Sequence, residues 1–213
     1  MEMHAYPYDY LSTAQRIMGD MLDFAVNTCE MDVEQYFDLF LISDVSRQFQ
    51  SGNPAYVAGK TGCELVKEVV AGTGLKPVHY EDEMYVDKSP EYWAGWALAY
   101  YQWETSRTFG KINKAVSISR VVAMYPVYHE MDIYHFVDTM NELWDMYYKE
   151  TNLKRIRKMV GLSQSELAEL SGVSLRQIQL FEQRQRDINR TRAIDVVKLG
   201  RVLGCNAEEL LQI

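Results

Sequence analysis

The side chains with the clearest chemical potential lie between residues 174 and 182. Arg176 can donate two parallel hydrogen bonds to guanine, and the side-chain amides of Gln177 and Gln179 can pair with adenine. Leu175 can contact the methyl group of thymine. Because Gln177 is also placed to cap a helix, we expect it to contribute less than Arg176. The pattern predicts a helix whose amino-terminal end reads bases in the major groove of DNA.

A second group of polar side chains surrounds this segment and suits contacts to DNA phosphates. Such contacts fix the register of a protein on DNA without reading its sequence. Glu182 cannot bind a phosphate, and we expect it to pair with a nearby arginine instead. The predicted phosphate-binding residues are Ser174, Arg184, Arg186, Asn189 and Arg190.

Two short helices must position these side chains. Ser163 followed by Glu166, and Ser174 followed by Gln177, have the spacing of capping boxes at helix starts. Gly172 lies between the two helices and supplies a tight turn. Apolar residues at helical spacing in these two helices, in one helix before them and in one after them are predicted to form a shared interior. Asn206 with Glu209 is expected to cap a last, closing turn. The expected interior residues are Leu153, Ile156, Val160, Leu167, Leu170, Val173, Ile178, Phe181, Ile194, Val197, Leu199 and Leu203.

Residues 152–213 resemble the lambda-repressor-like helix-turn-helix family, which includes Cro, phage repressors and xenobiotic-response-element regulators. The resemblance implies a five-helix domain that binds double-stranded DNA, with Gln164 at the position that contacts the DNA backbone. The family often has glycine shortly after the glutamate that ends the recognition helix, whereas this chain has Arg184. The matching segments are Leu153-Lys154-Arg155-Ile156-Arg157, Leu162-Ser163-Gln164-Ser165-Glu166-Leu167-Ala168, Ser171-Gly172-Val173-Ser174, Ile178-Gln179-Leu180-Phe181-Glu182 and Leu203-Gly204-Cys205.

Charge divides the chain near the same place. Residues 152–213 carry eleven Lys or Arg against seven Asp or Glu, a net of +4. Residues 1–151 carry eleven against twenty-three, a net of −12. This asymmetry favours one oriented basic face over DNA binding by the whole surface. The acidic residues Asp20, Asp23, Glu34 and Asp38 lie opposite apolar stripes, and we expect a solvated face there.

Residues 1–151 are predicted to form a mainly helical domain, so the fold class is all-α with two domains. Its role would be dimerisation, partner binding or sensing, and it resembles only vaguely the amino-terminal region of uncharacterised bacterial regulators. A small hairpin over 78–86 is an alternative to loop there. The expected helices cover 11–25, 33–45, 61–69, 90–105 and 133–147.

Other chemistries find less support. The segment Ala58-Gly59-Lys60-Thr61 is similar to the end of a phosphate-binding loop, but Pro54 stands where that motif needs glycine. We expect Thr61 to cap a helix with Glu64 instead. Four aromatic residues on one helical face, Trp93, Trp96, Tyr100 and Trp103, indicate core, with a partner surface or ligand pocket as the alternative.

No cofactor, metal site or catalytic group is predicted, because the three cysteines and four histidines share no ligand spacing. We expect a cytoplasmic protein with no membrane span and no signal peptide. The predicted function is a sequence-specific DNA-binding transcriptional regulator, a dimeric repressor that occupies its operator. The alternative is an antitoxin whose acidic first domain neutralises a basic toxin and whose second domain represses its own operon.

Overall fold

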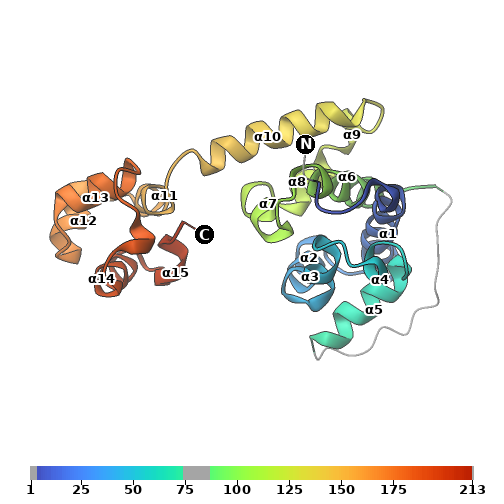
Figure 1. Cartoon of the computed structure of the whole chain (residues 1–213), viewed down its shortest axis with the longest axis horizontal. Coiled ribbons are helices and arrows are strands. Elements are labelled where there is room, and N and C mark those ends of the chain that lie inside the picture. Colours follow the sequence, from blue (N-terminus) through green and yellow to red (C-terminus); the bar gives the residue numbers. More distant parts are fainter. Residues whose placement is uncertain (1–3, 74–86, 213) are drawn as a thin grey trace. The chain divides into compact units, whose positions relative to one another are not determined.

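The computed structural model describes residues 4–73 and 87–212, and within these ranges the chain is helical and contains no strand. The predicted all-α class is therefore confirmed. The chain divides into two compact units, Met1–Trp144 and Asp145–Ile213, called unit 1 and unit 2 below (Figure 1). The range 78–86, where a hairpin was an alternative, lies outside the described residues.

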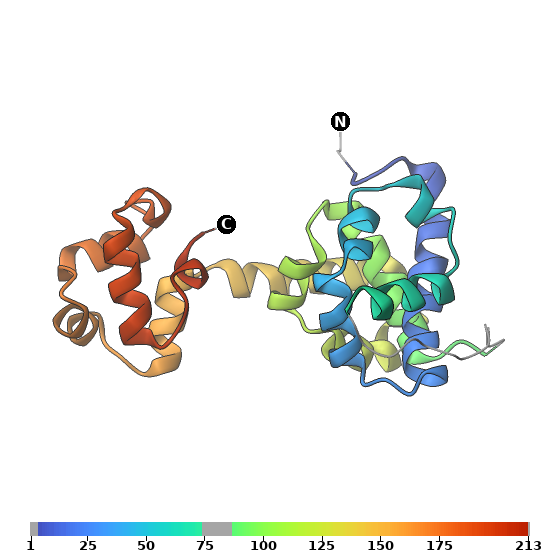
Figure 2. The same ribbon diagram turned by 90° about the horizontal axis from the view of Figure 1, so that it is seen from below.

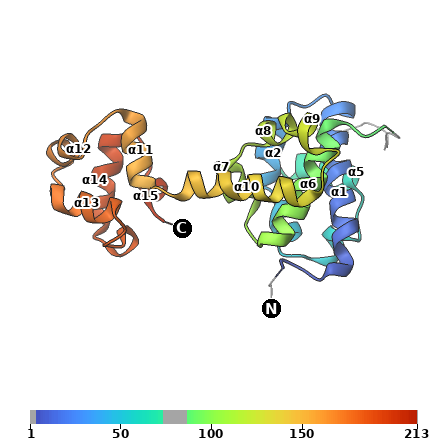
Figure 3. The same cartoon turned by 90° about the horizontal axis from the view of Figure 1, so that it is seen from above.

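Unit 1 is built around the pairing of α1 with α6. Figures 1 and 3 show α1 running beside α6, with α5 on another side. A Cβ atom at Gly95 of α6 would lie 2.3 Å from the carbonyl oxygen of Met18 in α1, so only glycine permits this backbone approach. The helices of unit 1 are η1 Tyr8–Tyr10, α1 Leu11–Asp23, the π-helical η2 Phe24–Thr28, α2 Val33–Ile42, α3 Asp44–Gln50, α4 Pro54–Val57, α5 Gly62–Gly72, α6 Pro90–Thr105, α7 Phe109–Ala115, α8 Ile118–Ala123, α9 Tyr125–Tyr128 and α10 Ile133–Tyr148, whose last residues belong to unit 2.

The single helix predicted over 33–45 is confirmed as far as Ile42 and wrong in its last three residues, because the chain breaks at Ser43. Ser43 has an extended backbone (ψ 160°), and its hydroxyl accepts a hydrogen bond from the N–H of Ser46. Serine competes with the helical backbone for hydrogen bonds and thus favours caps. One helix ends at Ile42, and α3 begins at Asp44.

The prediction that Asp20 and Asp23 are solvated is also wrong. Both are buried, at 6% and 3% exposure. Asp20 forms an ion pair with Lys88 at 3.1 Å. Asp23 accepts hydrogen bonds from the side chains of Asn27 and Ser89. Buried carboxylates need partners of this kind, and here the partners come partly from the residues that lead into α6.

Unit 2 is a five-helix bundle with an apolar interior of its own, as predicted. Helix α14 contacts α11, α12 and α15, and Figure 2 shows these helices in orange to red. The helices are α11 Asn152–Val160, α12 Gln164–Ser171, α13 Leu175–Glu182, the 3₁₀ turn η3 Ile188–Arg190, α14 Ala193–Leu203 and α15 Ala207–Leu210. The buried apolar residues are Leu153, Leu167, Val173, Ile178, Phe181, Ile188, Val196, Leu199, Leu203 and Leu210.

Three residues predicted to point into this interior are exposed instead. Val160, Leu170 and Ile194 are 46%, 62% and 53% exposed. Leu170 and Val160 lie at or next to helix ends, and Ile194 lies in the first turn of α14. At such positions the helical period alone does not decide which side chains are buried.

Candidate nucleic-acid interface

Local hydrogen bonds set where α12 and α13 begin and how the chain turns between them. Ser163 and Glu166 form the predicted capping box at the start of α12. Gly172 ends α12 with φ 67°, a left-handed conformation that glycine adopts without strain. The Ser174 hydroxyl accepts from the N–H of Gln177, but the Gln177 side chain accepts from that hydroxyl and not from the Ser174 N–H. The second predicted capping box is therefore only half formed.

Asn206 also departs from its predicted capping role. It precedes α15, yet its side chain makes no capping hydrogen bond. The turn is instead closed by a backbone bond from the N–H of Glu209 to the Asn206 carbonyl.

The predicted base-reading residues occupy the first turns of α13. Leu175 and Arg176 are exposed, whereas Gln177 and Gln179 are half-buried. Within the described part of the chain, the Arg176 guanidinium has no hydrogen-bond or ion-pair partner. It is therefore available to a ligand outside the domain.

A buried polar cluster holds the far end of α13 against α11 and α12. The Arg157 guanidinium donates to both carboxylate oxygens of Glu182, at 2.6 and 2.8 Å. The Gln164 side chain donates to the same carboxylate at 2.7 Å. The hydrogen bonds from Arg157 to Glu182 raise the pKa of Arg157, so the guanidinium stays charged. Glu182 is thus structural, as predicted, and Gln164 already has a partner inside the domain.

Arg184 stands where related domains often have glycine, and it adopts the backbone conformation that glycine favours. Its φ is 57°, in the left-handed region. Its guanidinium donates to the carbonyl oxygen of Tyr148 at 2.6 Å. The turn after α13 therefore has a left-handed residue at this position, although the residue is not glycine. The arginine side chain is held by its hydrogen bond within unit 2.

The remaining predicted phosphate contacts differ in how free they are. Arg186 is exposed, with its guanidinium 5.9 Å from the centre of the Phe181 ring. Arg190 is 88% exposed and forms a 3.5 Å ion pair with Asp187, which costs little to exchange because exposed pairs contribute little. By contrast, the Asn189 side-chain amide both donates to and accepts from the backbone of Gln212, at 2.8 Å each.

Comparison with known proteins identifies this part of the chain. Residues 153–210 match the family model described as helix-turn-helix. This segment is a helix-turn-helix domain. The resemblance predicted for residues 152–213 is thereby confirmed, and the domain is of the DNA-binding regulatory kind, not a catalytic one. No curated protein and no solved structure matches the chain.

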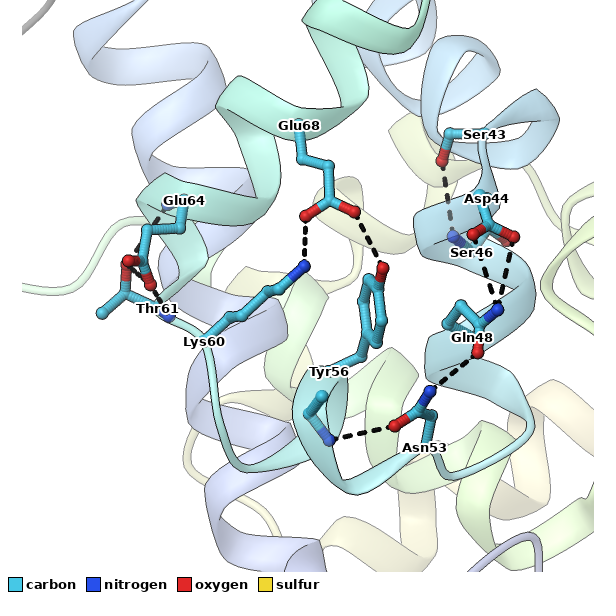
Figure 4. A network of polar contacts seen from close by, with 11 residues as sticks. Ser43, Asp44, Ser46, Gln48, Asn53, Tyr56, Lys60, Thr61, Glu64 and Glu68 are labelled. Carbon is cyan, nitrogen blue, oxygen red and sulfur yellow. Dashed lines mark hydrogen bonds and ion pairs between the residues drawn. The ribbon is translucent and has the colours of Figure 1, made fainter.

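Outside the helix-turn-helix domain, the segment similar to a phosphate-binding loop is occupied by internal contacts (Figure 4). The Glu68 carboxylate pairs with Lys60 and accepts from the Tyr56 hydroxyl at 2.8 Å. The hydrogen bond to Glu68 raises the pKa of Lys60. Thr61 forms the predicted capping box with Glu64 at the start of α5. Lys60 and Thr61 therefore both have structural roles within unit 1.

Cysteine and histidine do not gather into a site in the portion of the chain that is described. No group of three or more His, Cys, Asp or Glu that could hold a metal ion occurs there. Burial raises the pKa of Cys29 to about 11, which leaves it mainly in the unreactive thiol form. Across the same residues, no helix is long and apolar enough to cross a membrane.

The aromatic residues of α6 are only partly core. Tyr100 and Trp103 are buried at 9% and 5% exposure, as the core interpretation predicts. Trp93 and Trp96 are half-buried and border hollows of the unit 1 surface. One hollow of about 350 Å³ contains both tryptophans, and a second of about 410 Å³ shares Trp96 with it. Spacing on one face identified the stripe but not its partial exposure.

Proposed function

We propose that this protein is a transcriptional repressor that occupies operator DNA through its helix-turn-helix domain. The observation that supports the proposal most directly is the Arg176 guanidinium in the first turn of α13, which is exposed and has no hydrogen-bond or ion-pair partner among the described residues. The opposite end of the same helix is fixed by the buried pair of Arg157 and Glu182. A helix fixed at one end, with free polar groups at the other, is suited to reading base edges in the major groove.

Within this proposal, Leu175, Arg176, Gln177 and Gln179 read bases. Arg176 contributes most, because the two glutamines are half-buried and Gln177 is engaged with Ser174. A bidentate arginine contact to guanine is worth about 1–3 kcal/mol of discrimination.

The phosphate contacts are proposed in two groups. Arg186 and Arg190 can reach DNA without losing a strong internal contact. Ser174 can donate to a phosphate if its hydroxyl gives up the hydrogen bond to the Gln177 side chain. Gln164, Arg184 and Asn189 must either exchange their internal partners or act by holding the backbone in place. The whole chain has a net charge of −8, which does not favour binding to DNA. The exposed arginines place positive charge on one part of the surface, where it can meet phosphates.

We further propose that the repressor binds as a homodimer. Two recognition helices would then enter successive major grooves about 34 Å apart, and the operator would be nearly palindromic. Residues 1–151 would form the separate domain that supplies dimer or partner contacts.

The test is a selection of bound fragments from random DNA, made with the purified full-length protein at physiological salt. We expect a two-fold symmetric motif with half-sites one helical turn apart. The Arg201→Ala variant is a matched control, since it removes an exposed arginine from α14, outside the recognition helix. It should recover the same motif. Recovery of no motif would contradict sequence-specific repression, and a motif without symmetry would contradict the dimer.

An antitoxin is the second candidate, favoured by the net charge of −12 over residues 1–151. An acidic surface increases the rate at which a basic partner is captured. Co-expression with the product of the adjacent gene distinguishes the two functions. An antitoxin should form a stable complex and restore growth, whereas a stand-alone repressor should do neither.

A further inference from the structure

The larger hollow on unit 1 is walled by aromatic rings that already contact one another. His4 stacks on Trp103, with ring centres 3.8 Å apart and planes inclined by 10°. Tyr8 and Tyr100 approach the same indole at 5.9 and 5.8 Å, and Tyr134 meets Tyr100 edge-on at 6.3 Å. The indole N–H of Trp103 donates to the backbone oxygen of Tyr6 at 2.8 Å, and this hydrogen bond fixes the ring. The wall is pre-organised.

Parts of this wall are left in solvent. Tyr8 is 74% exposed and Tyr134 is 59% exposed. Exposed tyrosines beside a fixed tryptophan are typical of binding surfaces, where such rings carry much of the affinity. A volume of about 410 Å³ lies within the range of small-ligand and side-chain pockets.

Gln15 adds an unmet hydrogen-bond donor to the hollow. The residue borders the hollow and is only 6% exposed. Its side-chain nitrogen Nε2 has no partner anywhere in the described chain. A buried donor without a partner costs about 1–3 kcal/mol. A carbonyl oxygen from a ligand would remove this cost.

The electrostatics of the hollow favour a cation. Among the described residues that line it, Glu104 is the one carboxylate, and no Lys or Arg is present. Its oxygen Oε2 lies 3.6 Å from Nδ1 of His4, so a bound cation would share this carboxylate with the imidazole or displace it. The pKa of Tyr100 is raised, mainly by burial and further by a hydrogen bond with Tyr134 and the charge of Glu104. This phenol therefore stays neutral. Aromatic faces beside a carboxylate attract guanidinium and ammonium groups. For this hollow a basic partner is favoured over a second copy of the unit, because the basic partner is captured faster by an acidic surface.

We propose that the hollow binds a basic side chain of a partner polypeptide, with its cation against the aromatic wall and Glu104. The neighbouring peptide carbonyl accepts the hydrogen bond from Gln15. An arginine fits best, because its flat guanidinium both stacks on rings and pairs with a carboxylate. The proposal does not depend on DNA binding, since every lining residue belongs to unit 1.

The test is a titration of the full-length protein with N-acetyl-arginine methylamide, without DNA, followed by NMR of the tryptophan indole N–H signals. We expect the Trp103 and Trp96 signals to shift while the Trp144 signal stays. The matched probe, N-acetyl-citrulline methylamide, has the same shape without the charge and should bind at least tenfold more weakly. Equal binding of both probes, or no binding of either at millimolar concentration, would overturn the proposal.

Variants assign the individual contacts. Glu104→Gln should weaken binding of the arginine probe at least tenfold, whereas Glu142→Gln removes an exposed carboxylate of α10 outside the hollow and should not. Gln15→Leu should also weaken binding while leaving the fold at least as stable, because it removes an unpaired donor. If agmatine, which lacks the carbonyl, binds as tightly as the arginine probe and Gln15→Leu has no effect, the ligand is a free amine and the polypeptide assignment is wrong.

Discussion

Whether an arginine in this domain holds the fold or meets a ligand depends on what its guanidinium already contacts. The Arg157 side chain is 10% exposed and donates two hydrogen bonds to the Glu182 carboxylate. Arg157 lies in α11, whereas Arg176 lies in α13, where it is exposed and has no partner among the described residues. The same chemical group therefore has a structural role in one place and a proposed recognition role in the other.

Arg176→Ala should weaken binding to the selected operator by about 1–3 kcal/mol and relax the preference at one base position. The stability of the fold should change little, because Arg176 makes no hydrogen bond or ion pair within the described residues. Binding to the operator and to its single-base variants measures both effects. The Arg201→Ala control should weaken all sequences slightly and equally, and an unchanged sequence preference in Arg176→Ala would refute the assignment.

The buried pair should behave asymmetrically when one partner is removed. Glu182→Leu leaves the Arg157 charge buried without its carboxylate, and the expected loss is about 3–5 kcal/mol of unfolding free energy. The double variant Arg157→Met/Glu182→Leu removes both charges and should lose less than Glu182→Leu alone. Urea denaturation of the wild type, the two single variants Glu182→Leu and Arg157→Met, and the double variant measures this. A double variant as unstable as the sum of the two single variants would contradict the pairing.

Arg184 combines an unfavourable backbone conformation with a favourable side-chain contact, and two substitutions separate them. Arg184→Ala and Arg184→Gly both lose the hydrogen bond to Tyr148. Only alanine keeps the cost of the left-handed φ, which is about 1–2 kcal/mol. Arg184→Gly should therefore be more stable than Arg184→Ala by about 1 kcal/mol in chemical denaturation. Equal stabilities would mean that the turn relaxes away from positive φ.

At the scale of elements, α12 and α13 depend on their caps and on tertiary packing. Each has eight residues, and isolated helices shorter than about 12–15 residues are marginal in water. The capping box at Ser163 satisfies two backbone N–H groups at the start of α12, one from the box glutamate and one from Ser163 itself. The exact start of α12 positions the turn that leads into the recognition helix.

Ser163→Ala should lower the unfolding free energy by about 1 kcal/mol in urea denaturation.

The contribution of Glu166 should depend on pH, because its hydrogen bonds to Ser163 lower the pKa of its carboxyl. The stabilisation is complete above the unfolded pKa of about 4.3, and it is lost as pH falls through the lower, folded value. The difference in stability between wild type and Glu166→Gln should therefore be present at neutral pH and vanish in acid. A difference that persists in acid would exclude the ionised cap.

Sequence predicts best where several local signals coincide. Around Gly172 the caps, the turn and the apolar spacing all indicate the same two helices, and the structure has them. In unit 1 the stripe over 33–45 continues across Ser43, and only the hydrogen bond from Ser46 shows the break. Asp20 could not be predicted as buried, because its partner Lys88 lies 68 residues away along the chain. Long-range partners and partial exposure, as at Trp96, depend on tertiary packing that no local pattern encodes.

At the scale of the whole molecule, the two units have separate interiors. The buried apolar residues of unit 1 and those of unit 2 form distinct clusters with no member in common. Charge follows the same division, from −12 over residues 1–151 to +4 over residues 152–213. DNA repels the first part and attracts the second. A repressor of this design would use the basic unit for DNA and leave the acidic unit for other partners.

Separate interiors lead us to expect two unfolding transitions in calorimetry of the full-length protein. Operator DNA at a hundredfold excess over its Kd should stabilise only one of them, by about 2.7 kcal/mol. Leu199→Ala, in the unit 2 interior, should lower that same transition by about 2–5 kcal/mol. Phe40→Ala, in the unit 1 interior, should lower the other, and the arginine probe should raise it. If both substitutions lowered one shared transition, the units would unfold together, and a ligand in unit 1 would then necessarily change the stability of the DNA-binding unit as well.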